Sequence, residues 1–354
     1  MTNIRVRGEE IRHFILDSVD QHPTDICRLT AEHFGISRQA VNKHLKRLKS
    51  ELALSVEGKT KNHTYKLAPQ VEWQSPAYAI SPGLAEDVIW TDAIVPILGN
   101  QPDNVLDIWQ YGFTEMFNNA IDHSGGSKIF AQIIKTAATT EMVLRDDGIG
   151  IFKKIQIALN LLDERHAILE LAKGKLTTDP ERHTGEGIFF TSRMFDSFDI
   201  LSGGVFFSHE FGKPKDWILE RDRLREGSSV WMKLSNHTAR RMKPIFDQYV
   251  SGDDYGFTKT VVPVKLAQYG NDKLISRSQA KRLLARVELF KKVKFDFAGV
   301  PTIGQAFSDE IFRVFANQHP EIIISSVNEN EEVAQMIQRA KSGEAIKKGE
   351  VAPQ

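Results

Sequence analysis

The most informative part of the chain is the stretch Glu115-Met-Phe-Asn-Asn-Ala-Ile-Asp-His-Ser124. On a helix, Glu115 and Asn119 lie four residues apart, so their side chains stack on one face, one turn apart. An amide oxygen is a hard ligand that suits Mg²⁺, and a carboxylate can orient or deprotonate the nucleophile that attacks a γ-phosphate. A carboxylate and an amide placed in this way can therefore serve one magnesium-bound phosphate chain.

Two glycine-containing motifs follow this stretch. Asp146-Asp-Gly-Ile-Gly150 comes after the strand-like run 141–145, and His183-Thr-Gly-Glu-Gly187 opens another helical segment. Each of the three pieces is common by itself. A Glu and an Asn at helical spacing usually sit on a solvated face, and Asp-Asp-Gly after a strand is usually a turn. The order and spacing of all three are much more specific than any one of them.

In order and spacing, the three pieces resemble the asparagine box and the two glycine boxes of the GHKL superfamily of ATP-binding domains. That superfamily includes type II topoisomerase ATPase subunits, a family of heat-shock chaperones, mismatch-repair ATPases, histidine kinases and the anti-sigma-factor serine kinases. The resemblance covers residues 84–235. It implies an α/β sandwich in which helices cover one face of a mixed sheet, with ATP and Mg²⁺ as ligands.

Residue by residue, the resemblance implies roles for the side chains of these motifs. Glu115 matches the catalytic carboxylate, Asn119 the Mg²⁺-ligating asparagine, and Asp146 the aspartate that accepts the adenine amino hydrogen. Ser228 stands on the last strand, where the family usually has a threonine that hydrogen-bonds near adenine. Asp122 is typical of the topoisomerase branch, whereas His123 resembles the histidine of the anti-sigma kinases, so the subfamily stays open. The remaining matches are glycines that let the backbone approach the nucleotide and a histidine typical of anti-sigma kinases: Gly148, Gly150, Gly185, Gly187 and His123.

The first 68 residues carry a local basic patch. From Arg38 to Lys66 the sequence has eight basic residues and two acidic ones. Apolar residues at helical spacing predict three helices, which a hairpin with a basic tip follows. This order resembles a winged helix-turn-helix, whose recognition helix enters the major groove of DNA; a winged helix that docks a protein is the alternative. The residues expected to contact double-stranded DNA are Ser37, Arg38, Gln39, Asn42, Lys43, Lys46, Lys59, Lys61 and His63.

Residues 255–342 alternate between strand-like and helical segments, which indicates a small α/β layer. The segment resembles STAS-like domains, in which anti-sigma antagonists carry a phosphorylatable Ser or Thr in the loop after a central strand. Thr302 lies in that loop and is a candidate phosphosite, although its surroundings differ from the antagonist pattern. A capping or turn threonine is the alternative. The resemblance also suggests that this domain binds a protein partner.

The segments between these modules complete the expected fold class, which is α+β multidomain. Residues 69–83 contain prolines and a glycine and are predicted to be a linker. Residues 236–254 are predicted to be a linker helix, and residues 343–354 a frayed tail. Between Gly150 and Gly185 the GHKL family places a lid that closes over the phosphates. Lys175 is a basic residue of the corresponding segment here.

Composition narrows the class of protein further. The 354-residue chain has 46 basic and 46 acidic residues, so its net charge indicates no partner. No apolar run reaches the roughly 18–20 residues that cross a bilayer, and the N-terminus lacks the apolar core of a signal peptide. The single cysteine, Cys27, cannot form an internal disulfide and is expected to be a small core residue. We expect a cytoplasmic protein without membrane contact.

Together these features predict an ATP-responsive transcriptional regulator, in which the ATP-binding domain controls the DNA-binding domain. The chain is expected to form a homodimer, because both resembled modules usually do. Two alternatives stay open: a protein serine/threonine kinase of the anti-sigma type, and a scaffold that binds nucleotide without turnover. Histidine kinase activity is not expected, because no dimerisation helix with a phospho-accepting histidine precedes Glu115.

Overall fold

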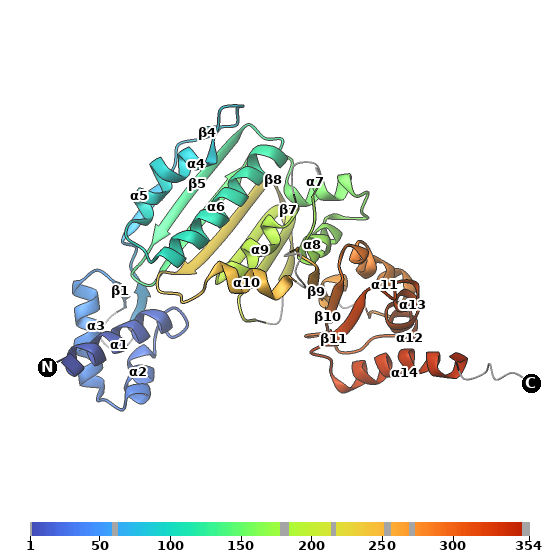
Figure 1. The fold of residues 1–354 in the computed structure, drawn as a ribbon. Coiled ribbons are helices and arrows are strands. Elements are labelled where there is room, and N and C mark those ends of the chain that lie inside the picture. The colour runs from blue at the N-terminus through green and yellow to red at the C-terminus, as the bar shows by residue number, and fades with distance from the viewer. Residues whose placement is uncertain are drawn as a thin grey trace, which may run out of the picture.

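The computed structural model describes residues 2–58, 63–177, 184–213, 217–250, 256–268 and 273–348. The chain forms three parts in sequence order, and they make an arch whose two legs are the N-terminal and C-terminal parts (Figure 1). The central part carries a large sheet with helices against it. Among the helices of the described residues, none combines the length and the apolar character needed to span a membrane.

The N-terminal part consists of three helices and a two-stranded hairpin, as the sequence predicts. Gly35 ends the second helix in the left-handed conformation, with φ of 61°, which glycine adopts without strain. Ser37 caps the third helix by accepting a hydrogen bond from Ala40 N at 3.2 Å, and Val41 and Leu45 are buried in the core. The elements are α1 (Thr2–Ser18), α2 (Ile26–Phe34), α3 (Arg38–Ser50), β1 (Leu54–Glu57) and β2 (Thr64–Leu67).

The sheet of the central part has the strand order β3-β5-β6-β8-β7, and β4 also pairs with β5. All pairings between its described strands are antiparallel, so the expectation of a mixed sheet is wrong. The short turn 136–138 makes β5 and β6 a hairpin, which requires antiparallel pairing. Residues 69–83, predicted to be a linker, contribute β3 and β4 to the sheet. The strands are β3 (Val71–Gln74), β4 (Tyr78–Ala79), β5 (Lys128–Lys135), β6 (Thr139–Asp146), β7 (Ser197–Glu210) and β8 (Trp217–Ser235).

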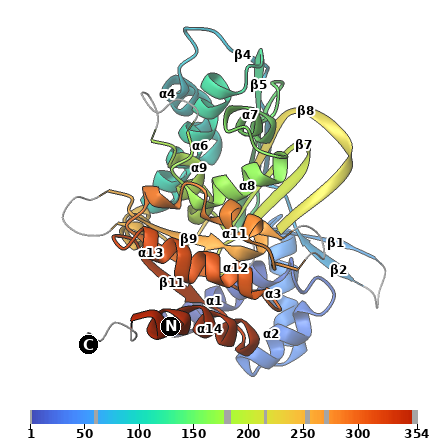
Figure 2. The ribbon, with the colours of Figure 1, turned by 90° about the vertical axis from the view of Figure 1, so that its right-hand side faces the viewer.

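Helices cover one face of this sheet (Figure 2). The longest of them, α6, buries Trp109, Phe113 and Phe117. Gly112 permits this close packing, because a Cβ built there would lie 2.5 Å from the ring of Phe195. The helix α10 lies in the predicted linker-helix segment. The helices are α4 (Glu86–Ile89), the π-helical turn η1 (Trp90–Ile94), α5 (Val95–Leu98), α6 (Asp103–His123), α7 (Ile151–Ala158), α8 (Glu164–Lys173), α9 (Gly187–Met194) and α10 (Met242–Tyr249).

The C-terminal part is a small α/β layer, as predicted. Its strands pair in parallel in the order β11-β10-β9, so β10 is central. The backbone of α14 is helical as far as Lys348, which lies within the segment predicted to be a frayed tail. The elements are β9 (Lys259–Pro263), η2 (Val264–Ala267), α11 (Arg277–Leu284), η3 (Val287–Leu289), β10 (Lys292–Asp296), α12 (Gln305–Asp309), η4 (Glu310–Phe315), α13 (Ala316–Gln318), β11 (Ile323–Val327) and α14 (Glu331–Lys348).

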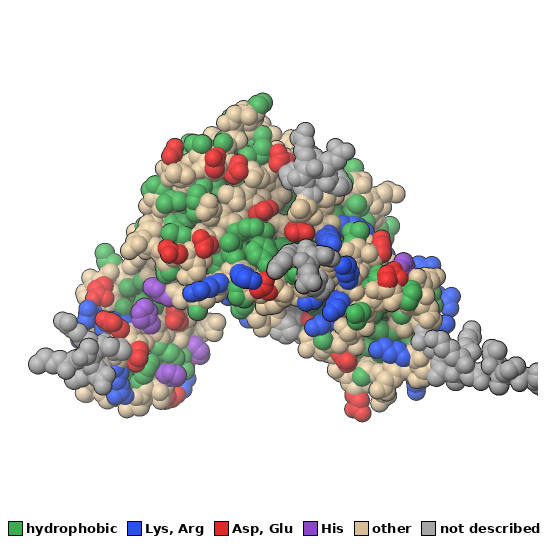
Figure 3. Space-filling model, viewed as in Figure 1, with side chains coloured by type: hydrophobic (Ala, Val, Ile, Leu, Met, Phe, Trp, Pro, Cys, Tyr) green, Lys and Arg blue, Asp and Glu red, His purple; other side chains and the backbone are tan. Residues whose placement is uncertain are grey.

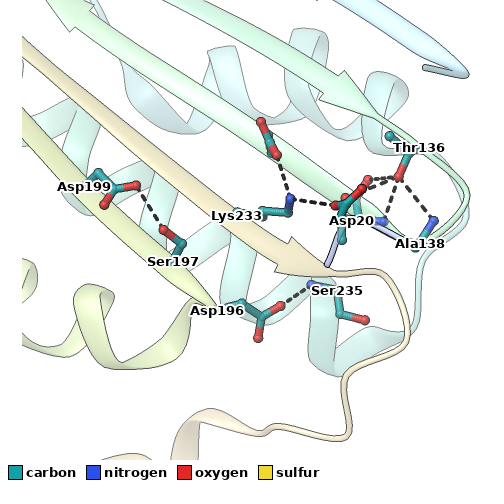
Figure 4. Close-up of polar contacts among 10 residues, drawn as sticks. Asp20, Thr136, Ala138, Asp196, Ser197, Asp199, Lys233 and Ser235 are labelled. Carbon is teal, nitrogen blue, oxygen red and sulfur yellow. Dashed lines mark hydrogen bonds and ion pairs between the residues drawn. The ribbon is translucent and has the colours of Figure 1, made fainter. Parts of the chain in front are cut away.

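The turn between β5 and β6 joins the central sheet to the N-terminal part. Ala138 in this turn is buried in the core of the N-terminal part. Close by, Nζ of Lys233 on β8 lies 3.4 Å from Asp20, just after α1, and 3.0 Å from Glu141 on β6 (Figure 4). Burial acts to lower the pKa of Lys233, but the two carboxylates outweigh it and raise the pKa. Lys233 is therefore a cation that links the two parts.

The junction between the central and C-terminal parts is more apolar. One hydrophobic core runs through both parts, with the rings of Phe189 and Phe257 4.7 Å apart between centroids. At the end of α8, Lys173 Nζ donates to the carbonyl of Ala285 at 2.5 Å. The hydroxyl of Thr260 donates to the carbonyl of Lys173 at 2.6 Å. Apolar and polar contacts thus fix α8 to the C-terminal part.

Candidate functional site

A cavity of about 290 Å³ opens between the helical layer and the sheet of the central part. This volume is close to the lower end of the range for small-molecule sites. The cavity lies beside the end of β6 and the start of α9. Seven of the nine nucleotide-site residues predicted from the sequence line it: Glu115, Asn119, His123, Asp146, Gly185, Gly187 and Ser228.

Asp146 ends β6 at the wall of this cavity, and backbone groups hold its carboxylate in place. Its Oδ1 accepts hydrogen bonds from Gly148 N at 2.9 Å and from Ser228 N at 3.2 Å. Burial raises the pKa of the Asp146 carboxyl group, and the two backbone donors oppose that rise. The carboxylate is therefore preoriented at the wall, which suits it to accept a hydrogen bond from a ligand.

Gly148 and Gly150, the two predicted residues that do not line the cavity, lie in the loop behind its wall. A Cβ on Gly148 would overlap the carbonyl of Ser124, and a Cβ on Gly150 would lie 2.5 Å from Ser202 Oγ. Gly150 also has φ of 89°, which strains any other residue. In this structure the two glycines therefore serve the tight packing of the loop that carries Asp146.

Ser228 connects β8 to the same loop. Its Oγ accepts a hydrogen bond from Ile151 N, the first residue of α7, at 2.9 Å. The preceding residue, Gly227, has φ of 75°, and a Cβ there would overlap the carbonyl of Asp146. The hydroxyl of Ser228 thus holds the start of α7, while its backbone N–H orients Asp146.

Glu115 meets the start of α9 at the cavity. A Cβ built on Gly187, the first residue of α9, would overlap the carboxylate of Glu115. The carboxylate therefore lies against a helix N-terminus, where backbone N–H groups favour negative charge. Burial, and next the charges of Glu115 and Glu186, raise the pKa of Tyr111, which lies one turn before Glu115 on α6. Glycine at position 187 is what permits this approach.

Asn119 lines the cavity one turn after Glu115. Its Nδ2 is buried and has no hydrogen-bond partner within the described part of the chain. Leaving a buried donor unpaired costs about 1–3 kcal/mol, so a ligand that accepts a hydrogen bond there would remove this cost. The amide oxygen is a suitable ligand for Mg²⁺. Asn119 thus has the chemistry to hold both a metal and an anionic ligand.

A metal at this site would need further oxygen ligands. Across the described ranges, no group of three or more His, Cys, Asp or Glu side chains could hold a metal ion. Mg²⁺ usually binds one or two protein groups and completes its shell with water and phosphate oxygens. The donor set around Asn119 therefore fits Mg²⁺ that arrives together with a phosphate-bearing ligand.

The rest of the cavity wall is mostly apolar. Strands β6, β7 and β8 and helix α7 contribute half of these apolar residues, and α6, which carries Glu115, contributes Met116 and Ala120. Apolar walls with a few placed polar groups are typical of small-molecule sites. The apolar lining residues are Met116, Ala120, Leu144, Ile151, Ile155, Leu171, Leu176, Ile188, Ile200 and Val230.

Lys154, which the sequence analysis did not single out, also lines the cavity. Its Nζ donates a hydrogen bond to the carbonyl of His123 at 2.6 Å, at the end of α6. Burial lowers the pKa of Lys154, and the charge of Asp122 opposes this shift. Its position could have been predicted from the sequence, because Lys154 lies one helical turn after Gly150, the last residue of the Asp-Asp-Gly-Ile-Gly motif.

The segment after α8 forms another edge of the cavity through Leu176 and Thr177. Leu176 N donates to the carbonyl of Gly185 at 3.0 Å, which ties this edge to the start of α9. Lys175, by contrast, turns toward the C-terminal part. Its Nζ donates to the carbonyl of Leu289 at 3.0 Å and lies 5.1 Å from the ring centroid of Phe290. The cavity edge is thus anchored on the C-terminal part.

The predicted DNA-contacting residues that the structure describes are all exposed on the N-terminal part. Ser37 stands at the start of α3, and His63 stands just before β2 and is exposed as well. Lys59 and Lys61, in the hairpin tip, lie outside the described residues. The exposed residues along α3 are Arg38, Gln39, Asn42, Lys43 and Lys46.

Thr302 lies in the loop between β10 and α12, so it follows the central strand of the C-terminal sheet, as predicted. The side chain is half-buried. Its neighbour Ile303 forms an isolated parallel bridge with Leu274, and Gly304 N donates to the carbonyl of Leu274 at 2.8 Å. The loop around Thr302 is therefore held in place by backbone contacts.

Comparison with known proteins bears on the C-terminal part. Residues 279–334 match the model of a family described as a STAS-like domain of unknown function (DUF4325). The match runs from α11 into α14 and includes the loop of Thr302. It confirms the predicted STAS-like domain over these residues. No curated protein and no solved structure matches the chain.

Proposed function

We propose that the central part is a GHKL-type domain that binds ATP and Mg²⁺, and that the protein is an ATP-responsive transcriptional regulator with a winged-helix DNA-binding part. The observation that carries the proposal is the convergence of Glu115, Asn119 and Asp146 on one cavity. The GHKL resemblance assigns these three polar residues to catalysis, metal binding and adenine recognition, and they come from two separate elements, α6 and β6.

The arrangement of polar and apolar groups supports adenine in particular. In this proposal the base lies on the apolar wall, and its amino group donates to the carboxylate of Asp146. Guanine presents a carbonyl in the corresponding place, so the carboxylate would repel it. Asn119 would hold Mg²⁺, which offsets the charge of the phosphates. Lys154 adds a cation to the same cavity.

Glu115 is the residue proposed to act on the nucleophile. Its carboxylate is placed by Gly187 against the start of α9, which also suits a phosphate. In an ATPase, Glu115 would orient or deprotonate water; in a kinase, it would act on a protein hydroxyl. The STAS-like match around Thr302 is the observation that favours the kinase as the second candidate.

Strand β6 supports the proposed link between nucleotide and DNA. It ends at Asp146 on the cavity wall and begins beside the turn whose Ala138 is buried in the N-terminal core. Eight residues of strand span about 27 Å, at about 3.4 Å per residue. A shift of Asp146 on nucleotide binding would therefore act along one rigid element toward the part that carries α3. Lys233, bound to Asp20 and Glu141, would transmit the same shift (Figure 4).

Thermal unfolding of the full chain with nucleotides tests the proposal. ATP with Mg²⁺ should stabilise the protein by about 2.7 kcal/mol at a hundredfold excess over its Kd, and GTP should do so much less. ATP labelled at the γ-phosphate then separates the candidates: free phosphate indicates an ATPase, labelled protein a kinase, and unchanged ATP a nucleotide-binding scaffold. Equal stabilisation by ATP and GTP, or none by ATP, would contradict the assignment of the cavity.

A further inference from the structure

A second cavity, of about 470 Å³, lies between the central and C-terminal parts. Its walls come from the end of α9, the end of β7, helix α10 with the segment before it, and strands β9 and β10. Pro263 and Asp296, which line it, are the last residues of two parallel strands. Ligands of α/β layers commonly bind at the carboxyl ends of such strands. The position of the second cavity therefore suits a ligand site.

Among the charged side chains in the described lining of the second cavity, cations outnumber carboxylates. Only one carboxylate, Asp296, is among these described lining residues. Lys and Arg side chains also gather on the underside of the arch, over the segment between β8 and α10 (Figure 3). This local charge favours an anionic ligand. The cations that line the cavity are Arg193, Lys213, Arg240 and Arg241.

Two of these cations already have carboxylate partners. Arg240 Nη2 donates to Asp196 Oδ1 at 2.8 Å, and Arg240 Nη1 donates to the carbonyl of Met194 at 2.6 Å. Lys213 forms an ion pair with Glu210. These two side chains therefore build the wall of the second cavity and contribute little uncompensated charge.

The other two cations are available to a ligand. Arg193 and Arg241 make no ion pair with a carboxylate in the portion of the chain that the structure describes. Toward the residues that the structure describes, Arg193 donates hydrogen bonds through Nη1 alone, to the carbonyl of Phe189 at 3.3 Å and to Ser192 Oγ at 2.7 Å, while its guanidinium lies 3.8 Å from the ring centroid of Phe189. Nε and Nη2 of its half-buried guanidinium thus remain for a ligand. Such a planar fork matches the geometry of phosphate oxygens.

Aromatic rings stand beside two arginines of the lining, Arg240 and Arg193. Phe211 is 49% exposed, and the guanidinium of Arg240 lies 3.6 Å from its ring centroid. The ring of Tyr249 also lines the cavity, 6.0 Å from the guanidinium of Arg193. An exposed ring beside a cation offers an apolar surface to the carbon part of a phosphate-bearing molecule.

The second cavity is separate from the first. Helix α9 contributes its first residue, Gly187, to the first cavity and Arg193, near its end, to the second. These two residues are six positions apart, which corresponds to about 9 Å along the helix axis at about 1.5 Å per residue. No residue lines both cavities among those that the structure describes.

We propose that the second cavity is a binding site for a small organic phosphate. Arg193 and Arg241 bind the phosphate group, and the ring of Phe211 contacts the organic group. A phosphate is favoured over a carboxylate, because a doubly charged group with three terminal oxygens can engage two guanidinium groups at once. The site would respond to a ligand of its own, independently of the proposed ATP site.

Calorimetric titration of the full-length protein tests this proposal, with phenyl phosphate as the probe and benzoate as the carboxylate control. Phenyl phosphate should bind more tightly than benzoate. Arg241→Ala, an exposed position, should lower its affinity at least tenfold, and Arg193→Lys should lower it because the fork is lost while the charge is kept. Lys243→Ala is the matched control, since Lys243 is paired with Asp247 outside the lining and should bind as the wild type does.

Three results would overturn the proposal. The first is the absence of phenyl phosphate binding to the wild-type protein. The second is unchanged affinity in Arg241→Ala and Arg193→Lys. The third is loss of binding in Asp146→Asn with retention in both arginine variants, which would place the probe in the first cavity. If the first result is accompanied by binding of duplex DNA that depends on the same arginines, the surface would be assigned to DNA.

Discussion

Arg286 Nη1 of the C-terminal part lies 3.4 Å from Glu170 Oε2 on α8 of the central part. Glu170 is buried, with its side chain 4% exposed, and it also pairs with the buried Lys173 at 2.7 Å. Arg286 donates a second hydrogen bond to the carbonyl of Lys175, just before Leu176 at the cavity edge. The side chain of Arg286 therefore holds one wall of the proposed ATP site from a different part of the protein.

Replacing Arg286 by alanine should weaken both the fold and the proposed ATP site. Removing one partner of a fully buried pair costs about 3–5 kcal/mol, but Lys173 still pairs with Glu170, so we expect about 1–3 kcal/mol in urea unfolding. ATP affinity should fall as well, because the edge formed by Leu176 loses its support. Arg277→Ala, exposed on α11, is the control and should change neither quantity. A loss of stability without any change in ATP affinity would show that this contact is purely structural.

Asp146→Asn should abolish adenine selectivity while the protein stays folded. The carboxamide keeps the size of the side chain, but it replaces a charged acceptor with a neutral group that also donates. Binding of ATP and GTP, measured by calorimetry with Mg²⁺, should converge as ATP affinity falls. Undiminished ATP affinity in the variant would refute the role assigned to Asp146.

The raised pKa of Asp146 also gives a pH dependence of stability. Burial lifts this pKa in the folded protein above the ordinary value of 3.8. The folded state therefore holds the proton more tightly than the unfolded state, and the carboxyl group contributes stability that is present below pH 3.8 and lost as the pH rises through the folded pKa. Relative to Asp146→Asn, the wild-type protein should lose free energy of unfolding as the pH rises from about 4. Parallel pH profiles for the two proteins would contradict the shift.

Part of this site could be predicted because it depends on local periodicity. Helical spacing alone puts Glu115 and Asn119 on one face, and a strand followed by Asp-Asp-Gly puts Asp146 at a strand end. The contact between Gly187 and Glu115 has no such local signal. It depends on how α9 approaches α6, and that approach is set by packing of the core.

Tertiary pairing also explains the elements that the sequence analysis missed. Strands β3 and β4 lie in a proline-containing segment and are four and two residues long. They are strands because β5 pairs with them, as in the pair of Trp73 and Ile133. Strand formation depends strongly on such neighbours, so short strands of this kind carry little sequence pattern of their own. The anchoring of the cavity edge by Arg286 was missed for the same reason.

The exposed face of α3 should give DNA binding a measurable salt dependence. Each phosphate contact contributes about 0.9 to the slope of log K against log salt concentration. Arg38→Ala with Lys43→Ala should therefore weaken binding to duplex DNA and reduce the slope by up to about 1.8. Arg277→Ala with Lys281→Ala, two exposed positions on α11 of the C-terminal part, is the charge-matched control. An unchanged slope in the double variant would favour a winged helix that docks a protein.

Glu115 and Asn119 should give two distinguishable phenotypes if the proposed chemistry is correct. Glu115→Ala should bind ATP with Mg²⁺ but fail to turn it over, because the carboxylate acts on the nucleophile and contributes little to ground-state binding. Asn119→Ala should lose Mg²⁺-dependent binding as well, because the phosphates then lack the metal held by the amide. Affinity measured with and without Mg²⁺ separates the two variants.

Gly187→Ala tests whether the contact between the start of α9 and the carboxylate of Glu115 matters for turnover. Its methyl group would overlap the carboxylate of Glu115 and displace it from the start of α9, so turnover should fall toward that of Glu115→Ala. Gly83→Ala is the matched control, since a Cβ there meets no atom within 4 Å and turnover should not change.

If the protein is an ATP-responsive regulator, the nucleotide state should also change its DNA affinity. Glu115→Ala, trapped with ATP, should differ from Asn119→Ala in DNA affinity when ATP is present. Equal DNA affinity of these two variants, with and without ATP, would show that the central part does not control DNA binding.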